Sequence, residues 1–152
     1  MAIQLTSEAF SDGTMIPKRF SCDGEDRSPP LSWSGLPTET ASLALICDDP
    51  DAPVGTWDHW VLFNIPAPAT GLPENVPAKA TLDDGSVHGN NSWGRLGYGG
   101  PCPPGGTHRY FFKLYALDIA LNLKTGATKS QLVKAMEGHI LDQGQLMGKY
   151  RR

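Results

Sequence analysis

Two aspartates and two histidines stand where apolar stretches of the chain end or begin. Asp49 and Asp51 lie in the run DPDAP at residues 49–53, and His59 opens the next apolar stretch. His108 opens a third one, directly after a loop of glycine and proline. A carboxylate beside an imidazole fixes which ring nitrogen carries the proton and favours the charged form. The residue types therefore predict a site that binds an anion such as phosphate, sulfate or a carboxylate.

The loop before His108 reads GYGGPCPPGG over residues 97–106. Gly99 and Gly100 tolerate positive φ, which lets a ligand approach the backbone closely. Amides exposed by such glycines form concave anion-binding nests. We therefore expect this loop to shape a pocket, with Trp57 and Tyr110 as its aromatic walls.

Three stretches that are dense in branched and aromatic residues predict the strands that position these groups. They cover residues 42–47, 59–65 and 109–117, and this composition is typical of buried β-strands. If the first two strands pair as a hairpin, the end of one lies beside the start of the other. Asp49 and Asp51 would then share a rim with His59.

One segment has the period of an α-helix. Thr128 and Gln131 have the spacing of a capping box, and Gly138 is expected to end the helix. Its predicted apolar face consists of Leu132, Val133 and Met136. Residues 143–150 alternate enough for a last strand. The sequence thus predicts one mainly β domain over residues 1–152, with one or two short helices near the C-terminus.

Composition indicates an ordinary globular protein. The 152 residues carry a net charge of −3, and 39% are hydrophobic. The few basic residues are scattered, which argues against nucleic-acid binding. We find no apolar run of the roughly 18–20 residues that a membrane span needs, and no secretory signal peptide. The expected location is the cytoplasm.

Three cysteines at wide spacings do not resemble a disulfide framework, so a reduced protein is expected. Cys22 and Cys102 both lie in loops rich in proline or glycine, and the sequence leaves open whether they approach each other.

Each of these features also has an ordinary structural interpretation, because strand-end histidines, Asp-Pro turns and Gly-Pro loops are common. A hydrolase with His59 or His108 as general base is the enzymatic alternative. Against this alternative, the sequence contains neither a Gly-x-Ser-x-Gly elbow nor a Walker loop. The candidate nucleophile, Cys102, is flanked by prolines. A metal site from Asp49, His59 and His108 would lack tight ligand spacing. We therefore expect neither catalysis nor a metal or other cofactor.

Two motifs in a fixed order give the chain a family resemblance. The run at 49–53 followed by His59-Trp60, and the run GPCPP at 100–104 followed by His108-Arg109-Tyr110, resemble the phosphatidylethanolamine-binding protein family. The prokaryotic, Raf-kinase-inhibitor-like branch is the nearest match. The similarity extends over the whole chain and includes residues 28–33 and 138–141.

The resemblance implies an antiparallel β-sandwich, with a large central sheet, a smaller sheet and an anion pocket at one end. The implied ligands are phosphate, sulfate, acetate or a phosphorylethanolamine-like lipid headgroup, bound without stable membrane insertion. Asp51 belongs to the same motif, either as a ligand-binding or as a structural residue. The implied pocket residues are Asp49, Trp57, His59, Gly100, Pro101, His108 and Tyr110.

The resemblance also implies a role as an inhibitor or modulator of a protein kinase or peptidase, and a homodimer. Eukaryotic members carry a second histidine directly before the position of His59, where this chain has Asp58. An acidic side chain there is expected to weaken anion binding, so ligand preference does not transfer between branches.

Overall fold

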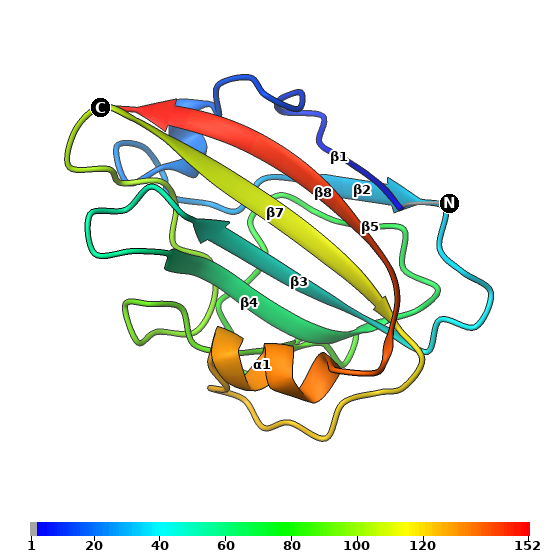
Figure 1. Cartoon of the computed structure of the whole chain (residues 1–152). Coiled ribbons are helices and arrows are strands. Elements are labelled where there is room, and N and C mark those ends of the chain that lie inside the picture. The colour runs from blue at the N-terminus through cyan, green and yellow to red at the C-terminus, as the bar shows by residue number, and fades with distance from the viewer. Residues whose placement is uncertain (1–2) are drawn as a thin grey trace.

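The computed structural model describes residues 3–152, and these form two antiparallel sheets and one α-helix (Figure 1). The elements are β1 (Gln4–Thr6), the 3₁₀ helix η1 (Lys18–Phe20), β2 (Leu31–Ser34), β3 (Ser42–Asp49), β4 (Trp57–Pro66), β5 (Gly71–Leu72), β6 (Val87–His88), β7 (Thr107–Leu117), α1 (Lys129–Met136) and β8 (Ile140–Arg151). The predicted fold class is confirmed.

The larger sheet has the strand order β6-β4-β3-β7-β8. Its three inner strands are the three predicted ones, and β3 pairs antiparallel with β4, which confirms the hairpin. The strand expected near the C-terminus is β8, which pairs with β7 along its whole length. The end of β3 and the starts of β4 and β7 meet at one end of this sheet, near the C-terminus of the chain (Figure 1).

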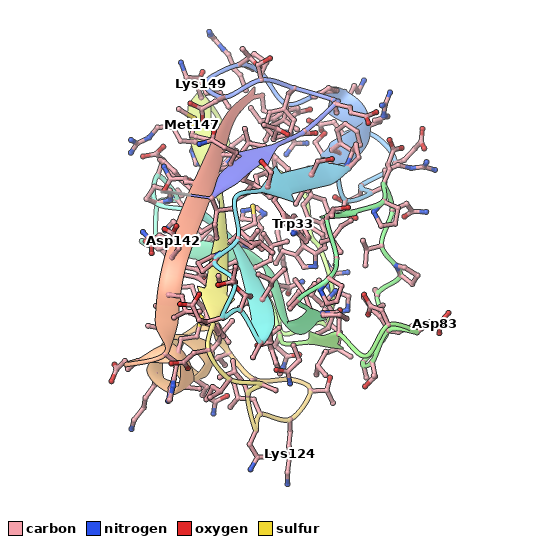
Figure 2. All side chains as sticks on the ribbon, turned by 90° about the vertical axis from the view of Figure 1, so that its right-hand side faces the viewer. Trp33, Asp83, Lys124, Asp142, Met147 and Lys149 are labelled. Atoms are coloured by element: carbon pink, nitrogen blue, oxygen red, sulfur yellow. A yellow bond between two sulfur atoms is a disulfide. The ribbon has the colours of Figure 1, made fainter. Side chains whose placement is uncertain are left out.

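The smaller sheet, in the order β1-β2-β5, packs on one face of the larger sheet, which we call the inner face (Figure 2). The core between the two sheets includes Trp33 of β2 and Leu45 of β3. The indole Nε1 of Trp33 donates a hydrogen bond to the Ala69 carbonyl oxygen at 2.8 Å. Buried Tyr and Trp residues usually satisfy their polar group in this way, so the smaller sheet is both packed and hydrogen-bonded.

Helix α1 covers the opposite, outer face of the larger sheet. Thr128 and Gln131 form the predicted capping box at its start. Leu132 and Met136 are buried against the sheet, but Val133 is 42% exposed. The prediction for Val133 was wrong because the helix is only two turns long and presents a narrow stripe, which Leu132 and Met136 already fill.

Strand β3 is buried on both faces, as expected from its apolar sequence. Leu43, Leu45 and Cys47 face the inter-sheet core, whereas Ala44 and Ile46 face the helix. Because successive side chains of a strand point to opposite faces, the acidic pair at the end of β3 is divided between them.

Candidate functional site

Alternation along β3 and β7 sends three polar residues to the inner face at the end of the larger sheet. Asp49 continues the inner-facing series of β3, and its side chain reaches across to β7. His108 and Tyr110 continue the inner-facing series of β7, which includes Phe112 and Leu114. Their strands are held together by the ladder between β3 and β7.

His59 reaches the same face because of an irregularity in β4. Cys47 pairs with Trp60 and the next residue, Asp48, pairs with Asp58, so His59 is an extra residue in β4. Such a bulge shifts the alternation by one position and re-aims the side chain. His59 is consequently placed against Tyr110, with ring centroids 5.0 Å apart in an edge-to-face arrangement.

Asp49 and His108 form a buried pair, with 2.7 Å between Asp49 Oδ2 and His108 Nδ1. The second carboxylate oxygen, Oδ1, accepts a hydrogen bond from the Asp51 backbone N–H at 2.7 Å. An ionised carboxylate can only accept, so His108 carries a proton on Nδ1. Its Nε2 is the ring nitrogen that remains for a ligand.

The second imidazole is oriented in the same way by the backbone. His59 Nδ1 lies 2.7 Å from the Gly99 carbonyl oxygen, which also requires a proton on Nδ1. Burial lowers the pKa of His59, although the Gly99 carbonyl and the Asp49 carboxylate oppose this shift. His59 is thus a neutral ring at pH 7 whose Nε2 remains for a ligand.

Tyr110 stands next to both imidazoles. Its ring centroid is 6.5 Å from that of His108, nearly parallel to it, in addition to the contact with His59. Burial raises the pKa of Tyr110, and the charge of Asp49 adds to this effect. Within residues 3–152 its buried hydroxyl makes no hydrogen bond of good geometry, and the acceptor within its reach is the Asp49 carboxylate. A buried hydroxyl without a well-formed hydrogen bond is costly, and a ligand oxygen would relieve that cost.

These groups open into a cavity of about 280 Å³ with largely apolar walls. Cys102, Pro103 and Pro104 of the loop that was expected to shape the pocket line it. Four more lining residues were not among the predicted site residues: Ala52, Pro53, Val54 and Trp93. Trp93 is the most important of them, because its ring lies 5.0 Å from that of His59. Asn91 positions it by accepting a hydrogen bond from the Trp93 N–H at 3.0 Å. The sequence did not indicate Trp93, because a tryptophan in an irregular loop belongs to no periodic pattern.

Five of the eight residues predicted for the site line this cavity: Asp49, Trp57, His59, His108 and Tyr110. Asp51 lies outside it and pairs with Arg109, whose Nη2 is 2.8 Å from Asp51 Oδ1. Hydrogen bonds from the Arg109 side chain lower the pKa of Asp51 to about 2. Of the two roles considered for Asp51, the structure shows the structural one.

Gly100 and Pro101 also lie outside the lining, and the expected amide nest is absent at these positions. The Gly99 N–H donates to the His59 carbonyl oxygen at 2.9 Å, and the Gly100 N–H donates to Asp26 Oδ1 at 2.8 Å. A Cβ at Gly100 would overlap the Phe20 carbonyl oxygen. The glycines therefore serve close packing of the loop rather than presenting free amides.

Cys22 and Cys102 form a disulfide bond, and Cys47 is free and buried. The expectation of three reduced cysteines was wrong for this pair. The error came from the wide spacing of the cysteines in the sequence, because the fold brings together two loops whose cysteines are 80 residues apart.

Comparison with known proteins shows the family of the chain. The family model described as phosphatidylethanolamine-binding protein matches residues 6–151. The chain belongs to this family. A protein named UPF0098 from Methanothermobacter thermautotrophicus is 60% identical over 150 residues, which cover 99% of each chain.

Two crystal structures of family members have nearly the same fold. A phosphatidylethanolamine-binding protein homolog from Chlamydia trachomatis superimposes with a TM-score of 0.92 at 46% identity, over 99% of this chain and 98% of that one. Escherichia coli YbcL, described as a new member of the mammalian family, gives 0.92 at 31% identity, over 100% and 99%. The resemblance predicted from the two motifs is confirmed.

Residues 3–152 contain neither of two further features, a membrane-spanning helix and a metal-binding group. No helix among them is long and apolar enough to cross a membrane, and no group of three His, Cys, Asp or Glu side chains is arranged to hold a metal ion. The cytoplasmic location and the homodimer stay predictions.

Proposed function

We propose that this chain binds a small anion in the cavity at the end of the larger sheet. The observation that carries the proposal is that Nδ1 of each histidine is hydrogen-bonded to the protein. His108 Nδ1 lies 2.7 Å from Asp49 Oδ2, and His59 Nδ1 lies 2.7 Å from the Gly99 carbonyl oxygen. Each Nε2 is thereby oriented before a ligand arrives. With Nδ1 already protonated, Nε2 of a neutral ring is an acceptor, and it becomes a donor to the anion when the ring takes up a second proton on binding. Groups that are oriented beforehand cost little entropy on binding.

The ligand class follows from the polar groups and the walls. Two imidazoles, once protonated on Nε2, and the Tyr110 hydroxyl suit the oxygens of phosphate, sulfate, acetate or a phosphoryl headgroup. The apolar walls exclude water and strengthen these hydrogen bonds. The phosphorylethanolamine group enters the proposal through the name of the family.

A titration followed by amide NMR tests the proposal. Phosphate, sulfate, acetate and phosphorylethanolamine are each added to the purified protein, with chloride at the same ionic strength as the control. Saturable shifts confined to the ends of β3, β4 and β7 and to the loop around Trp93 are expected. Shifts that are absent, or that spread evenly over the surface, would contradict it.

The pair of Asp49 and His108 supports a second candidate function, a hydrolase in which Asp49 orients His108 as general base for water. Cys102 is no longer available as its nucleophile, because it is part of the disulfide. Turnover of simple aryl esters and aryl phosphates that is lost in His108→Ala would favour this candidate. Binding without turnover would favour the binding protein.

Modulation of a protein kinase or peptidase would extend the proposed binding function. Such a partner would place a phosphoryl or carboxylate group in the cavity, next to the exposed side chains of Val54 and Trp93 at its edge. Inhibition of a test kinase or peptidase should then be relieved by inorganic phosphate. Inhibition that phosphate does not relieve would show that the inhibition does not depend on this cavity.

A further inference from the structure

The disulfide lies in the wall of the cavity rather than away from it. Cys102 is among the lining residues, together with its neighbours Pro103 and Pro104. Both cysteines of the bond are exposed residues. An exposed disulfide is open to thiol–disulfide exchange, which depends on access to the sulfur atoms.

The Cys22 side of the bond is firmly held by the rest of the protein. Ser21 Oγ lies 2.9 Å from the Tyr150 hydroxyl, which donates to Asp23 Oδ2 at 2.7 Å. Asp23 also pairs with Arg152, at 3.1 Å between Oδ1 and Nε. These contacts tie the segment around Cys22 to β8 and do not involve the disulfide.

The Cys102 side has far fewer anchors. Up to Pro101 the loop is held by Gly100 and by the Cys22 N–H, which donates to the Pro101 carbonyl oxygen at 3.1 Å. For residues 102–106, the described part of the chain shows two hydrogen bonds besides the disulfide, both with Arg152. The Arg152 backbone N–H donates to the Gly106 carbonyl oxygen at 3.4 Å, and Arg152 Nη1 lies 3.6 Å from Cys102 Sγ.

The composition of this segment reinforces the difference. Gly105 and Gly106 are exposed, and Gly106 has φ +73°. Segments with few hydrogen bonds and little burial open at low free-energy cost. Pro103 is the one buried side chain between the disulfide and β7.

We propose that the Cys22–Cys102 disulfide is a redox latch that keeps the segment 102–106, whose first three residues line the anion cavity, closed over it. A dithiol reductant supplies two electrons and two protons: the S–S bond breaks, two thiols form on the protein, and the reductant becomes a disulfide. The segment 102–106 then moves away from the cavity and the anion binds more weakly. The affinity part of this inference rests on the proposed function, whereas the motion of the segment does not.

The test compares the oxidised protein, the same protein reduced with a dithiol, and the double variant C22S/C102S. Hydrogen exchange of the Cys22 and Arg152 amides, which donate to the Pro101 and Gly106 carbonyl oxygens, and the Kd for inorganic phosphate are measured for each. We expect about tenfold faster exchange of these two amides and an about tenfold higher Kd after reduction, with unchanged protection of β3 and β7. The variant should match the reduced protein and should not respond to the dithiol, since its one remaining cysteine, Cys47, is buried.

Equal exchange in the oxidised and reduced proteins would overturn the latch, and so would loss of protection throughout β3 and β7, because the disulfide would then support the whole fold. If the variant fails to fold, the reduced wild-type protein decides between these outcomes. Faster exchange without phosphate binding in either state would support the motion and refute the proposed function.

Discussion

Asp48 and Asp49 are neighbours at the end of β3, both 3% exposed, yet they serve opposite faces of the sheet. Asp48 points outward and contacts two lysines, at 3.3 Å from Lys113 Nζ and 3.0 Å from Lys129 Nζ. Asp49 points inward and contacts one histidine. The strand period separates two carboxylates that are adjacent in sequence into two different environments.

The charges of the outer group neutralise one another, although Asp58 Oδ1 makes no hydrogen bond of good geometry within residues 3–152. Lys129, the first residue of α1, also lies 3.0 Å from Asp58 Oδ1, so two carboxylates face two ammonium groups. Partial burial by itself would lower the pKa of Lys129, but the contacts with Asp58 and Asp48 outweigh it and raise the pKa. This cluster joins the helix to the sheet and leaves no charge for a ligand.

The inner group is incomplete. His108 and His59 each keep Nε2 uncommitted, and the Tyr110 hydroxyl makes no hydrogen bond of good geometry within residues 3–152. Burial of a charged group therefore does not by itself indicate a binding site. What distinguishes the inner group is hydrogen-bonding capacity that the protein has oriented and left unused.

The largest effect is expected from breaking the outer cluster. Asp48→Asn should lower the free energy of unfolding by about 2–3 kcal/mol, because two partly buried ammonium groups lose a carboxylate. Urea denaturation measures the loss. Asp58→Asn is the matched control with a smaller expected loss, since its side chain is more exposed, 21% against 4%. Phosphate affinity should not change in either variant, and a large change would contradict the division between the faces.

His108→Ala breaks the inner group. Loss of a charge-assisted hydrogen bond should raise the Kd for phosphate about 10- to 100-fold, or about 1–3 kcal/mol. Calorimetric titration measures it, with Lys113→Ala on the outer face as the control. A normal Kd in His108→Ala would remove this residue from the site.

Thr128→Ala removes the cap of the helix that carries Lys129. It should destabilise the protein by about 1 kcal/mol, as read from urea or thermal unfolding. Because the helix covers only the outer face, the Kd for phosphate should stay the same. A coupled loss of affinity would show that the two faces are not independent.

The smallest effect concerns pH. Burial lowers the pKa of His59 below the ordinary value in the free protein, and a bound anion raises it again by favouring the imidazolium. Binding therefore takes up a proton between these two pKa values, so affinity should rise as pH falls from 7 to 5.5, by about threefold. Sulfate is the suitable anion because it does not titrate in this range. In His59→Ala the slope should shrink, and affinity that falls with decreasing pH would contradict the assignment.

Local sequence patterns predicted the parts of the fold that are themselves local. The three inner strands follow from apolar runs, and the helix start follows from Thr128 and Gln131. The short strands β1, β2, β5 and β6 were not predicted, because two to four residues carry no readable period.

The site was predictable to the same extent. Asp49 and His108 were indicated by their positions at strand ends. The bulge that turns His59 inward, the ring of Trp93 and the disulfide between Cys22 and Cys102 depend on contacts between distant segments. Gly100 was misassigned because a glycine that permits close packing looks the same in sequence as one that exposes its amide.

The most direct test of the account observes the imidazole nitrogens themselves. A two-bond ¹H–¹⁵N correlation spectrum at pH 7 is recorded for the oxidised protein without and with saturating phosphate. The account predicts a proton on Nδ1 of both His59 and His108, and a shift of both Nε2 resonances when phosphate binds. A proton on Nε2 alone in either ring, or Nε2 resonances that phosphate leaves in place, would contradict it.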